Sequence, residues 1–237
     1  MYNNMNKKEL VEIKKGSTGR GLLIENDGYI SLKENKQIKE DIENNGWHVP
    51  SPFVVDAVFQ KADVKNANGR IYPRKILERE VERYQERIKL RNALGELNHP
   101  SESTIDLGRI AINIIELHWE GNTVIGKMEI NISEGFRRYG ICSTLGDTTA
   151  NLLLNGYLIG VSSRAVGSVE SKLGTLVVGD DLEIICWDVV CDNSTPGAKI
   201  SMNGEEELQQ YVESDTTKNT KTKLDEKISK IENILLS

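Results

Sequence analysis

The stretch Leu182-Glu183-Ile184-Ile185-Cys186-Trp187-Asp188-Val189-Val190-Cys191 is rich in β-branched and aromatic residues, which is typical of a buried β-strand. Strand patterns also precede it at residues 157–163, 166–170 and 175–178. The connections between these segments are short, and short connections join antiparallel strands rather than parallel ones. We therefore expect neighbouring strands to pair into a barrel or closed sheet.

The pattern continues toward the N-terminus. Residues 53–59 form another β-branched and aromatic run, and residues 66–69 have the composition of a turn. Two apolar runs at residues 109–119 and 123–130 are separated by Glu120-Gly121-Asn122, which is a hairpin signal. The predicted fold class is α+β and mostly antiparallel β, with strands in the majority.

Two helices are predicted between these strands. Pro73 suits the first turn of a helix whose apolar residues share one face, namely Leu77, Val81, Tyr84 and Ile88. Residues 143–155 predict a second helix, with Ser143 as its N-cap and Gly156 as its C-terminal stop. Both helices are expected to pack on the sheet.

Composition divides the chain into four parts. Residues 1–46 are a polar extension in which Asn26-Asp27-Gly28 predicts a short hairpin, and residues 47–200 are the folded domain. Residues 201–223 are a linker with too little apolar content to fold alone, and residues 224–237 are an amphipathic helix. Its apolar residues have coiled-coil spacing: Leu224, Ile228, Ile231 and Leu235. This helix either folds back on the domain or mediates self-association or docking.

Charge and composition exclude several classes of protein. The chain has 237 residues, of which 38% are hydrophobic, and a net charge of −6 without an arginine cluster, so we expect no nucleic-acid partner. Neither a membrane-length apolar run nor a signal peptide is visible, so we expect neither membrane association nor export. The three cysteines lack metal-site spacing and fit a reducing compartment. We expect no metal and no other cofactor.

The carboxylate of Asp188 interrupts the apolar strand and needs a partner there. A histidine is a natural partner, and His99 stands in the distinctive run Gly95-Glu96-Leu97-Asn98-His99-Pro100. Serine becomes a nucleophile when a histidine takes its proton, and Gly160-Val161-Ser162-Ser163-Arg164 supplies two candidate serines. Because neighbouring side chains on a strand point to opposite faces, only one of Ser162 and Ser163 can contact His99.

These motifs, together with Ala67-Asn68-Gly69-Arg70-Ile71-Tyr72-Pro73 and Ser194-Thr195-Pro196-Gly197-Ala198, resemble the prohead core proteases of tailed bacteriophages. The resemblance covers about residues 50–200 in the same order. It implies a β-barrel flanked by helices, similar to the herpesvirus capsid maturation protease. It also implies cleavage of phage scaffold and major capsid proteins inside the immature prohead, in the host cytoplasm.

Carried over by position, the resemblance makes His99 the general base, Ser162 the nucleophile and Asp188 the acidic third member. Ser163 is the alternative nucleophile. The loop after the third member would hold the oxyanion, which points to Asn193 and Gly197, although a plain turn fits that loop equally well.

Further assignments stay open. Arg164 would position substrate or anchor a loop. His118 is the next candidate base if the motif assignment fails, and Cys142 is a weaker candidate nucleophile.

Members of that family are known to cut after a glutamate with an aliphatic residue two places before it, and to trim themselves. Matching triplets occur in the predicted extensions, namely Leu10-Val11-Glu12, Leu23-Ile24-Glu25, Leu32-Lys33-Glu34 and Leu224-Asp225-Glu226. The sequence thus suggests self-processing. Two alternatives remain: an inactive core or scaffold protein that keeps the protease fold, and a non-peptidase acyl hydrolase. The hydrolase is disfavoured because the second glycine of Gly-x-Ser-x-Gly is missing at residue 164.

Overall fold

A computed structural model of the chain describes residues 21–31, 40, 42–100, 102–172 and 175–191. The predicted linker, the predicted C-terminal helix and the loop that holds Asn193 and Gly197 lie outside these described residues.

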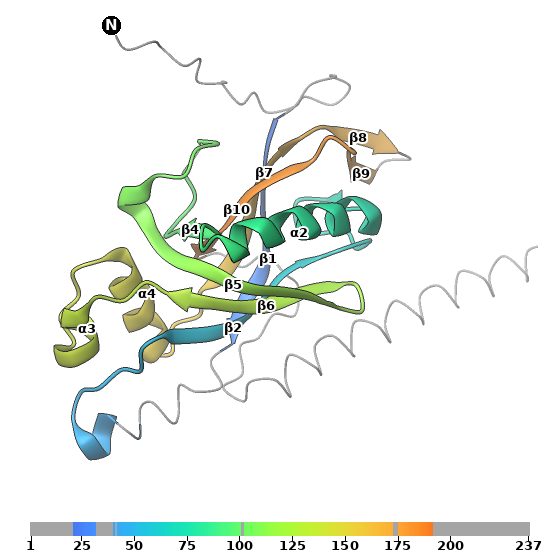
Figure 1. Cartoon of the computed structure of the whole chain (residues 1–237). Helices are drawn as coiled ribbons and strands as arrows, with labels where there is room; N and C mark the ends of the chain where they lie inside the picture. The colour runs from blue at the N-terminus through green and yellow to red at the C-terminus, as the bar shows by residue number, and fades with distance from the viewer. Residues whose placement is uncertain (1–20, 32–39, 41, 101, 173–174, 192–237) are drawn as a thin grey trace, which may run out of the picture.

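The main feature is a seven-stranded antiparallel sheet in the order β10-β7-β1-β2-β6-β5-β4 (Figure 1). Its strands are β1 (Gly21–Ser31), β2 (Phe53–Lys61), β4 (Leu94–Glu96), β5 (Ile110–Glu120), β6 (Thr123–Ile130), β7 (Gly160–Gly167) and β10 (Glu183–Val190). A smaller sheet contains β3 (Arg70–Ile71), β9 (Thr175–Val178) and β8 (Val169–Lys172), in that order. Only β3 and β9 pair in parallel among the described strands. The prediction of a mostly antiparallel α+β fold is confirmed.

The two edge strands of the large sheet, β4 and β10, curl round until they meet. They meet at one parallel bridge between Leu97 and Val189 and not along a ladder, so among the described residues the sheet is curled and open rather than a closed barrel. The cause is local: β4 has only three residues, and the chain turns away at Asn98, whose φ is +65°. That left-handed conformation is one that asparagine adopts more readily than most residues.

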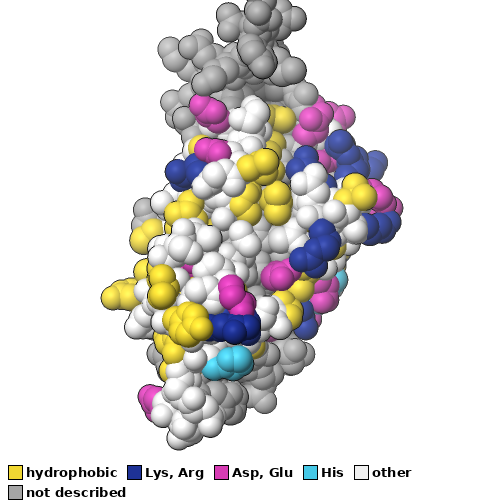
Figure 2. All heavy atoms as spheres, turned by 60° about the vertical axis from the view of Figure 1, so that its left-hand side comes forward, with side chains coloured by type: hydrophobic (Ala, Val, Ile, Leu, Met, Phe, Trp, Pro, Cys, Tyr) yellow, Lys and Arg dark blue, Asp and Glu magenta, His cyan; other side chains and the backbone are white. Residues whose placement is uncertain are grey.

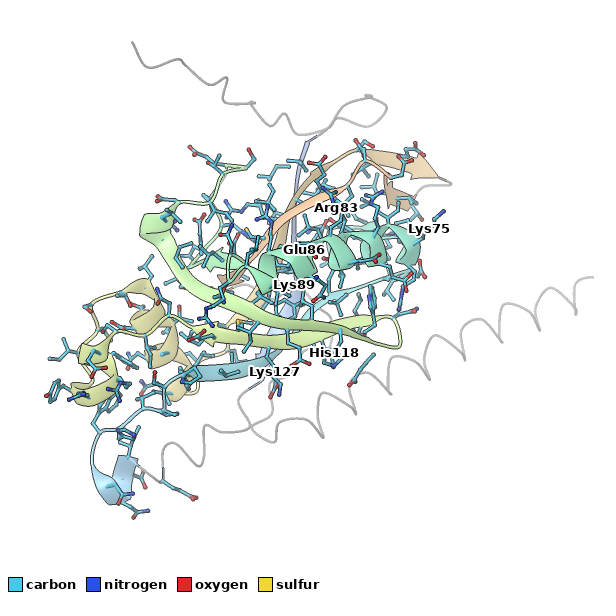
Figure 3. All side chains as sticks on the ribbon, in the orientation of Figure 1. Lys75, Arg83, Glu86, Lys89, His118 and Lys127 are labelled. Carbon is cyan, nitrogen blue, oxygen red and sulfur yellow. The ribbon has the colours of Figure 1, made fainter. Side chains whose placement is uncertain are left out.

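Helix α2 (Arg74–Lys89) crosses one face of the sheet, in contact with β5 and β10 (Figure 1). As predicted, Leu77, Val81 and Tyr84 are buried beneath it. The Tyr84 ring packs edge-on against Trp187 of β10, with ring centroids 4.8 Å apart. The opposite side of the helix carries charged side chains, among them Lys75, Arg83, Glu86 and Lys89 (Figure 3).

The helices α3 (Glu134–Tyr139) and α4 (Leu145–Leu154) lie together at one end of the sheet (Figure 1). The predicted cap at Ser143 is wrong by one residue, because Thr144 accepts a hydrogen bond from the amide of Asp147 and forms a capping box with it. Burial alone would raise the pKa of Asp147, but hydrogen bonds from the amides of Ser133, Ser143 and Thr144 outweigh it and hold that pKa below its usual value.

Strand β1 lies between β7 and β2, although its residues fall within the predicted N-terminal extension. The predicted hairpin at residues 26–28 is wrong, because the strand continues through this segment. A bulge between Glu25 and Gly28 absorbs one extra residue against β7. The segment Asn26-Asp27-Gly28 therefore forms a bulge within the strand rather than a turn.

The surface shows no separation of charge on the face seen in Figure 2, where basic and acidic side chains are interspersed. None of the helices in the described part of the chain is long and apolar enough to cross a membrane.

Candidate active site

The pairing of β7 with β10 gathers four polar side chains on one face of the sheet. Asp188 lies directly opposite Ser162, and Cys186 lies directly opposite Arg164. Paired residues and residues two apart share a face, so all four side chains leave the sheet on the same side. All four residues are fully buried. Strand register therefore brings together a serine and a carboxylate that are 26 positions apart in sequence.

The neighbouring Ser163 lies on the opposite face. It pairs with Trp187, which packs in the core against Phe59 and Tyr84. The hydroxyl of Ser163 is buried and has no hydrogen-bond partner. Of the two candidate serines, only Ser162 faces the histidine.

The loop after β4 delivers His99 to this face. The amide of Leu97 donates to the carbonyl of Arg109, at 3.1 Å, and the amide of Asn98 donates to the carbonyl of Val189, at 2.8 Å. These bonds tie the loop to Arg109 and to β10 immediately before the histidine. Together with the left-handed turn at Asn98, they aim the imidazole back at residue 188.

The imidazole of His99 connects Asp188 with Ser162. Its Nδ1 lies 2.8 Å from Oδ2 of Asp188, and its Nε2 is in hydrogen-bond contact with the Ser162 hydroxyl. A carboxylate only accepts, so Nδ1–H donates to it, and in the neutral ring Nε2 is left as an acceptor for the serine proton. The side chain of His99 is 12% exposed, against 0% for Asp188. This arrangement has the connectivity of a hydrolytic triad.

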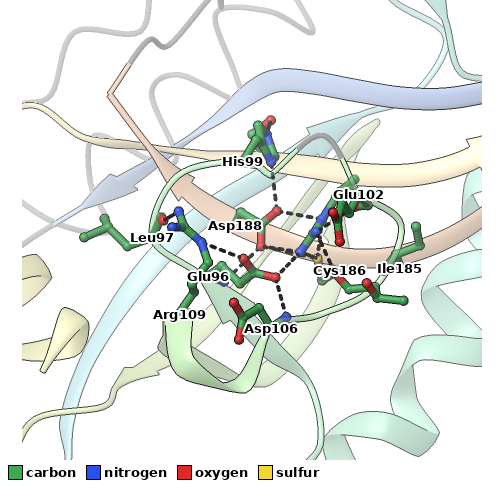
Figure 4. A network of polar contacts seen from close by, with 12 residues as sticks. Glu96, Leu97, His99, Glu102, Asp106, Arg109, Ile185, Cys186 and Asp188 are labelled. Carbon is green, nitrogen blue, oxygen red and sulfur yellow. Dashed lines mark hydrogen bonds and ion pairs between the residues drawn. The ribbon is translucent and has the colours of Figure 1, made fainter. Parts of the chain in front are cut away.

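Asp188 is held by more than the histidine (Figure 4). Its Oδ1 accepts from the amide of Glu96 at 2.9 Å and from the Cys186 thiol at 3.3 Å. The guanidinium of Arg164 faces both carboxylate oxygens, with Nη2 3.3 Å from Oδ1 and Nε 3.0 Å from Oδ2. The carboxylate is therefore fixed in orientation from three sides.

The charges of this cluster are balanced. Arg164 also donates to Glu96 at 2.8 Å, and Arg109 pairs with the other oxygen of Glu96 at 3.1 Å. Burial alone would lower the pKa of Arg164, but its anionic neighbours outweigh it and raise that pKa further. Burial, followed by the charge of Asp188, raises the pKa of the Cys186 thiol well above its usual value, so the thiol is neutral at pH 7. Two carboxylates thus face two guanidinium groups.

Glu25 in β1 supplies a third buried carboxylate, and this residue lies beside Ser162. Its main-chain carbonyl accepts a hydrogen bond from the Ser162 hydroxyl, and its side chain is fully buried. The carboxylate accepts from Arg70 at 2.7 Å, from Tyr72 at 2.8 Å and from Asn68 at 2.8 Å, and it is also bound by Asn66. We call these four residues the carboxylate cradle: Asn66, Asn68, Arg70 and Tyr72.

The Ser162 hydroxyl has a single hydrogen and two acceptors around it, Nε2 of His99 and the carbonyl of Glu25. It can donate to only one at a time. Because β1 fills the space in front of the serine, the residue has no exposed surface. A cavity of about 220 Å³ lined by Arg91, Ile110 and Asn131 is not lined by Ser162, His99 or Asp188.

The other candidate residues lie apart from this cluster. His118 on β5 is nearly half exposed and pairs with Glu116 at 3.0 Å (Figure 3). Cys142 is exposed, and its thiol lies 3.9 Å from the carbonyl of Asp147. Among the residues that the structure describes, no three His, Cys, Asp or Glu side chains are grouped so that they could hold a metal ion.

Three features of the site are not predicted in full from the sequence. The sequence leaves two roles open for Arg164, of which anchoring a loop agrees with its contacts to the carbonyls of Glu102 and Thr104, and it presents Glu96 only as part of a motif. The carboxylate cradle was recognised only as a turn of the family motif. The one signal for Glu96 is a charged residue at the end of a short strand, three positions before His99.

The known proteins to which this chain is similar are phage proteases. The family model described as prohead core protein serine protease matches residues 18–209. The prohead core protein protease of Enterobacteria phage T4 is 34% identical over 166 residues, which cover 69% of this chain and 74% of that protein. The solved structure of the bacteriophage T4 capsid assembly protease has a TM-score of 0.59 at 28% identity, covering 74% of this chain and 99% of that one. The chain belongs to the prohead core protein serine protease family.

Proposed function

We propose that the chain is a serine endopeptidase in which Ser162 is the nucleophile, His99 the general base and Asp188 the residue that orients the imidazole. The observation that carries this proposal is the continuous contact from Asp188 through His99 to the Ser162 hydroxyl. A weak nucleophile next to a neutral imidazole, which is oriented by a buried carboxylate, is suited to acyl transfer.

In the proposed mechanism, Nε2 of His99 takes the Ser162 proton as the oxygen attacks the peptide carbonyl. The imidazolium then returns the proton to the leaving amine, and water repeats the sequence on the acyl-enzyme. Asp188 stays ionised throughout and stabilises the imidazolium. We keep the loop with Asn193 and Gly197 as the proposed source of the oxyanion donors, each worth roughly 3 to 4 kcal/mol.

We further propose that β1 occupies the position of a substrate. It pairs antiparallel with β7, which carries the nucleophile, and the carbonyl of Glu25 touches the Ser162 hydroxyl. Adding an extended segment to a sheet edge is a common way for a protein to bind a peptide. The peptide bond that lies at the nucleophile is therefore the one between Glu25 and Asn26.

The cradle around Glu25 suits a substrate with glutamate before the cleaved bond. Four donors converge on one carboxylate, and the charge of Arg70 compensates its burial. Leu23, two places before Glu25, is buried as well. Of the four triplets in the predicted extensions, Leu23-Ile24-Glu25 is the one inside the described residues, and it lies against Ser162.

This arrangement also supports a latent state. While β1 lies between β7 and β2, no other peptide can reach Ser162. Cleavage after Glu25 would separate β1 into two segments that are no longer covalently joined, and the site would open when the first of them leaves.

The proposed place of action follows from the relatives. The T4 proteins are described as a prohead core protein protease and a capsid assembly protease. We propose that this chain cleaves phage capsid and scaffold proteins within the assembling head in the host cell. The inactive scaffold alternative is not favoured, because the matching relatives are proteases and the triad side chains are all present. A relation in fold to the herpesvirus protease stays a prediction.

Intact-mass measurement tests the proposal. Purified wild type is incubated beside Ser162→Ala and Ser163→Ala, and the mass of each is followed with time. We expect wild type and Ser163→Ala to lose residues 1–25, and Ser162→Ala to stay at full length. Ser163→Ala is the matched control because it removes a neighbouring hydroxyl from the other face.

Two results would contradict the proposal. Processing of Ser162→Ala at the wild-type rate would assign the cut to another protease. If Ser163→Ala lost processing and Ser162→Ala kept it, the nucleophile would be Ser163 and not Ser162.

A further inference from the structure

The buried guanidinium of Arg164 connects strand β7, which carries Ser162, with the loop that carries His99. The nucleophile and Arg164 are on the same strand, β7, and share a face. The base His99 stands on the loop that follows β4. The proton transfer therefore requires β7, β10 and the histidine loop to be held in register. Arg164 belongs to β7 and contacts both β10 and the loop.

Arg164 holds the histidine loop at several points. Its Nη1 donates to the carbonyl of Glu102 at 2.9 Å and to the carbonyl of Thr104 at 3.2 Å. Its Nη2 binds Glu96, whose carboxylate also accepts from the amide of Asp106 at 2.9 Å. These contacts flank His99 on both sides in sequence. The same guanidinium lies against Asp188, the partner of the histidine.

Glu96 completes the cluster from β4. Its amide donates to Asp188, and its carboxylate lies between Arg164 and Arg109. Without Glu96, a buried guanidinium would have only Asp188 to balance its charge. Without Arg164, two buried carboxylates would face each other, which is strongly unfavourable.

We propose that Arg164 and Glu96 are positioning residues, which hold the histidine loop and Asp188 in register with Ser162 and set the electrostatic balance under His99. The proposal rests on the proposed protease function of this site. Arg164 pairs with Ile24 of β1 through its main chain, whereas its side chain contacts Asp188, Glu96 and the histidine loop. Both side chains would therefore act through Asp188 and the loop.

Other groups surround the cluster and enter its charge balance. Cys186 of β10 donates to Asp188 and is neutral. Tyr84 of α2 lies close behind and stays protonated, because burial raises its pKa. Arg109 reaches Glu96 from the η1 turn (Leu107–Arg109), and β1 contributes the Glu25 carbonyl to the nucleophile. At neutral pH the charges of the cluster are those of Asp188, Glu96, Arg164 and Arg109, and the ion pair of Glu25 with Arg70 lies on the β1 side of Ser162.

The test compares Arg164→Lys, Arg164→Met and Glu96→Gln with wild type after self-cleavage. The substrate is a fluorogenic peptide with the sequence of residues 22–28, and kcat, KM and the pH–rate profile are measured. Arg164→Lys keeps the charge but loses the planar fork, so we expect kcat to fall about 10- to 100-fold with KM within about twofold.

The charge variants should move the acidic limb of the pH–rate profile in opposite directions. Arg164→Met leaves an excess negative charge that favours the protonated imidazole, so the limb should move to higher pH. Glu96→Gln leaves an excess positive charge, so the limb should move to lower pH. Each shift should be about one pH unit.

A matched control is Asp147→Asn, another fully buried carboxylate that accepts main-chain amides, in α4 and outside the site. It should lower the melting temperature and leave kcat and the pH–rate profile unchanged. The proposal would be overturned if the Arg164 and Glu96 variants behaved like Asp147→Asn, with a lower melting temperature but an unchanged kcat and pH–rate profile. If Arg164→Met fails to fold, Arg164→Lys and Glu96→Gln still decide the question.

The failure of this proposal differs from a failure of the protease function. If wild type shows no cleavage that Ser162→Ala abolishes, the function itself is wrong. If cleavage depends on Ser162 but Arg164→Lys keeps the wild-type kcat and Glu96→Gln keeps the wild-type profile, only the positioning role is wrong.

Discussion

The backbone of Gly95 lies directly against the carbonyl oxygen of Trp187. A Cβ atom at residue 95 would stand 2.1 Å from that oxygen and 2.8 Å from Cγ1 of Ile112. Gly95 belongs to β4, which leads to His99, and Trp187 precedes Asp188 on β10. The approach of these two edge strands, and with it the contact of His99 with Asp188, therefore depends on the missing side chain.

We accordingly predict that Gly95→Ala forces β4 away from β10. The overpacking should lower the free energy of unfolding by about 1–3 kcal/mol. A displacement near 1 Å at His99 should reduce kcat about 100-fold. Denaturant unfolding and peptide cleavage measure the two effects. Gly135→Ala is the control, because a Cβ there meets no atom closer than 3.7 Å, and it should match wild type in cleavage. Wild-type kcat in Gly95→Ala would contradict the prediction.

The second prediction concerns Ser162 and His99, which share one proton transfer in the proposed mechanism. Ser162→Ala and His99→Ala should each reduce kcat by on the order of 10⁴-fold, and the double substitution should be little worse than either alone. The reason is that neither residue performs its step without the other. Peptide cleavage at high enzyme concentration measures all three variants. Losses that multiply in the double variant would show that the two residues act independently.

Much of the fold was predictable because single strands carry their own pattern. The predicted strands at residues 53–59, 123–130 and 182–190 match β2, β6 and β10 to within two residues. Helix α3 was missed because six residues are too few to show a periodicity. Its signals were local: Ser133 accepts a hydrogen bond at the N-terminus, and Gly140 ends it with φ +71°.

The contact of His99 with Asp188 and Ser162 was predictable from motifs, but the surroundings of these residues depend on pairing between distant strands. Nothing in the local sequence indicates that Arg164 stands opposite Cys186 in the sheet. Likewise, the polar run after Ile24 reads as a turn in isolation. The structure keeps it in a strand because the cradle binds the Glu25 carboxylate, a contact between segments more than 40 positions apart.

The third prediction concerns the cradle. Arg70→Met removes the charged donor to Glu25, and a hydrogen bond to a charged group contributes about 1.5–3 kcal/mol. We therefore expect the preference for a Leu-Ile-Glu peptide over the Leu-Ile-Gln analogue to fall about 10- to 100-fold. The ratio of kcat/KM for the two peptides measures it.

A matched control for Arg70→Met is Arg83→Met, which removes an arginine from the exposed side of α2 (Figure 3). It should keep the wild-type ratio. An unchanged ratio in Arg70→Met would show that the cradle does not select the residue before the cleaved bond.

The last prediction follows from the buried Cys186 thiol. Burial and the nearby Asp188 charge raise the pKa of this thiol in the folded protein above its ordinary value of 9.0, which approximates that of the unfolded chain. Above that pH the unfolded chain loses the thiol proton while the folded protein keeps it, so the free energy of unfolding falls as pH rises. The slope from one group is at most about 1.4 kcal/mol per pH unit.

Denaturant unfolding between pH 8 and pH 10 measures this decline. The decline should appear in wild type and in Cys142→Ala, which removes an exposed cysteine, and it should be shallower in Cys186→Ala. Equal slopes in wild type and Cys186→Ala would mean that another group, such as Tyr84, causes the decline.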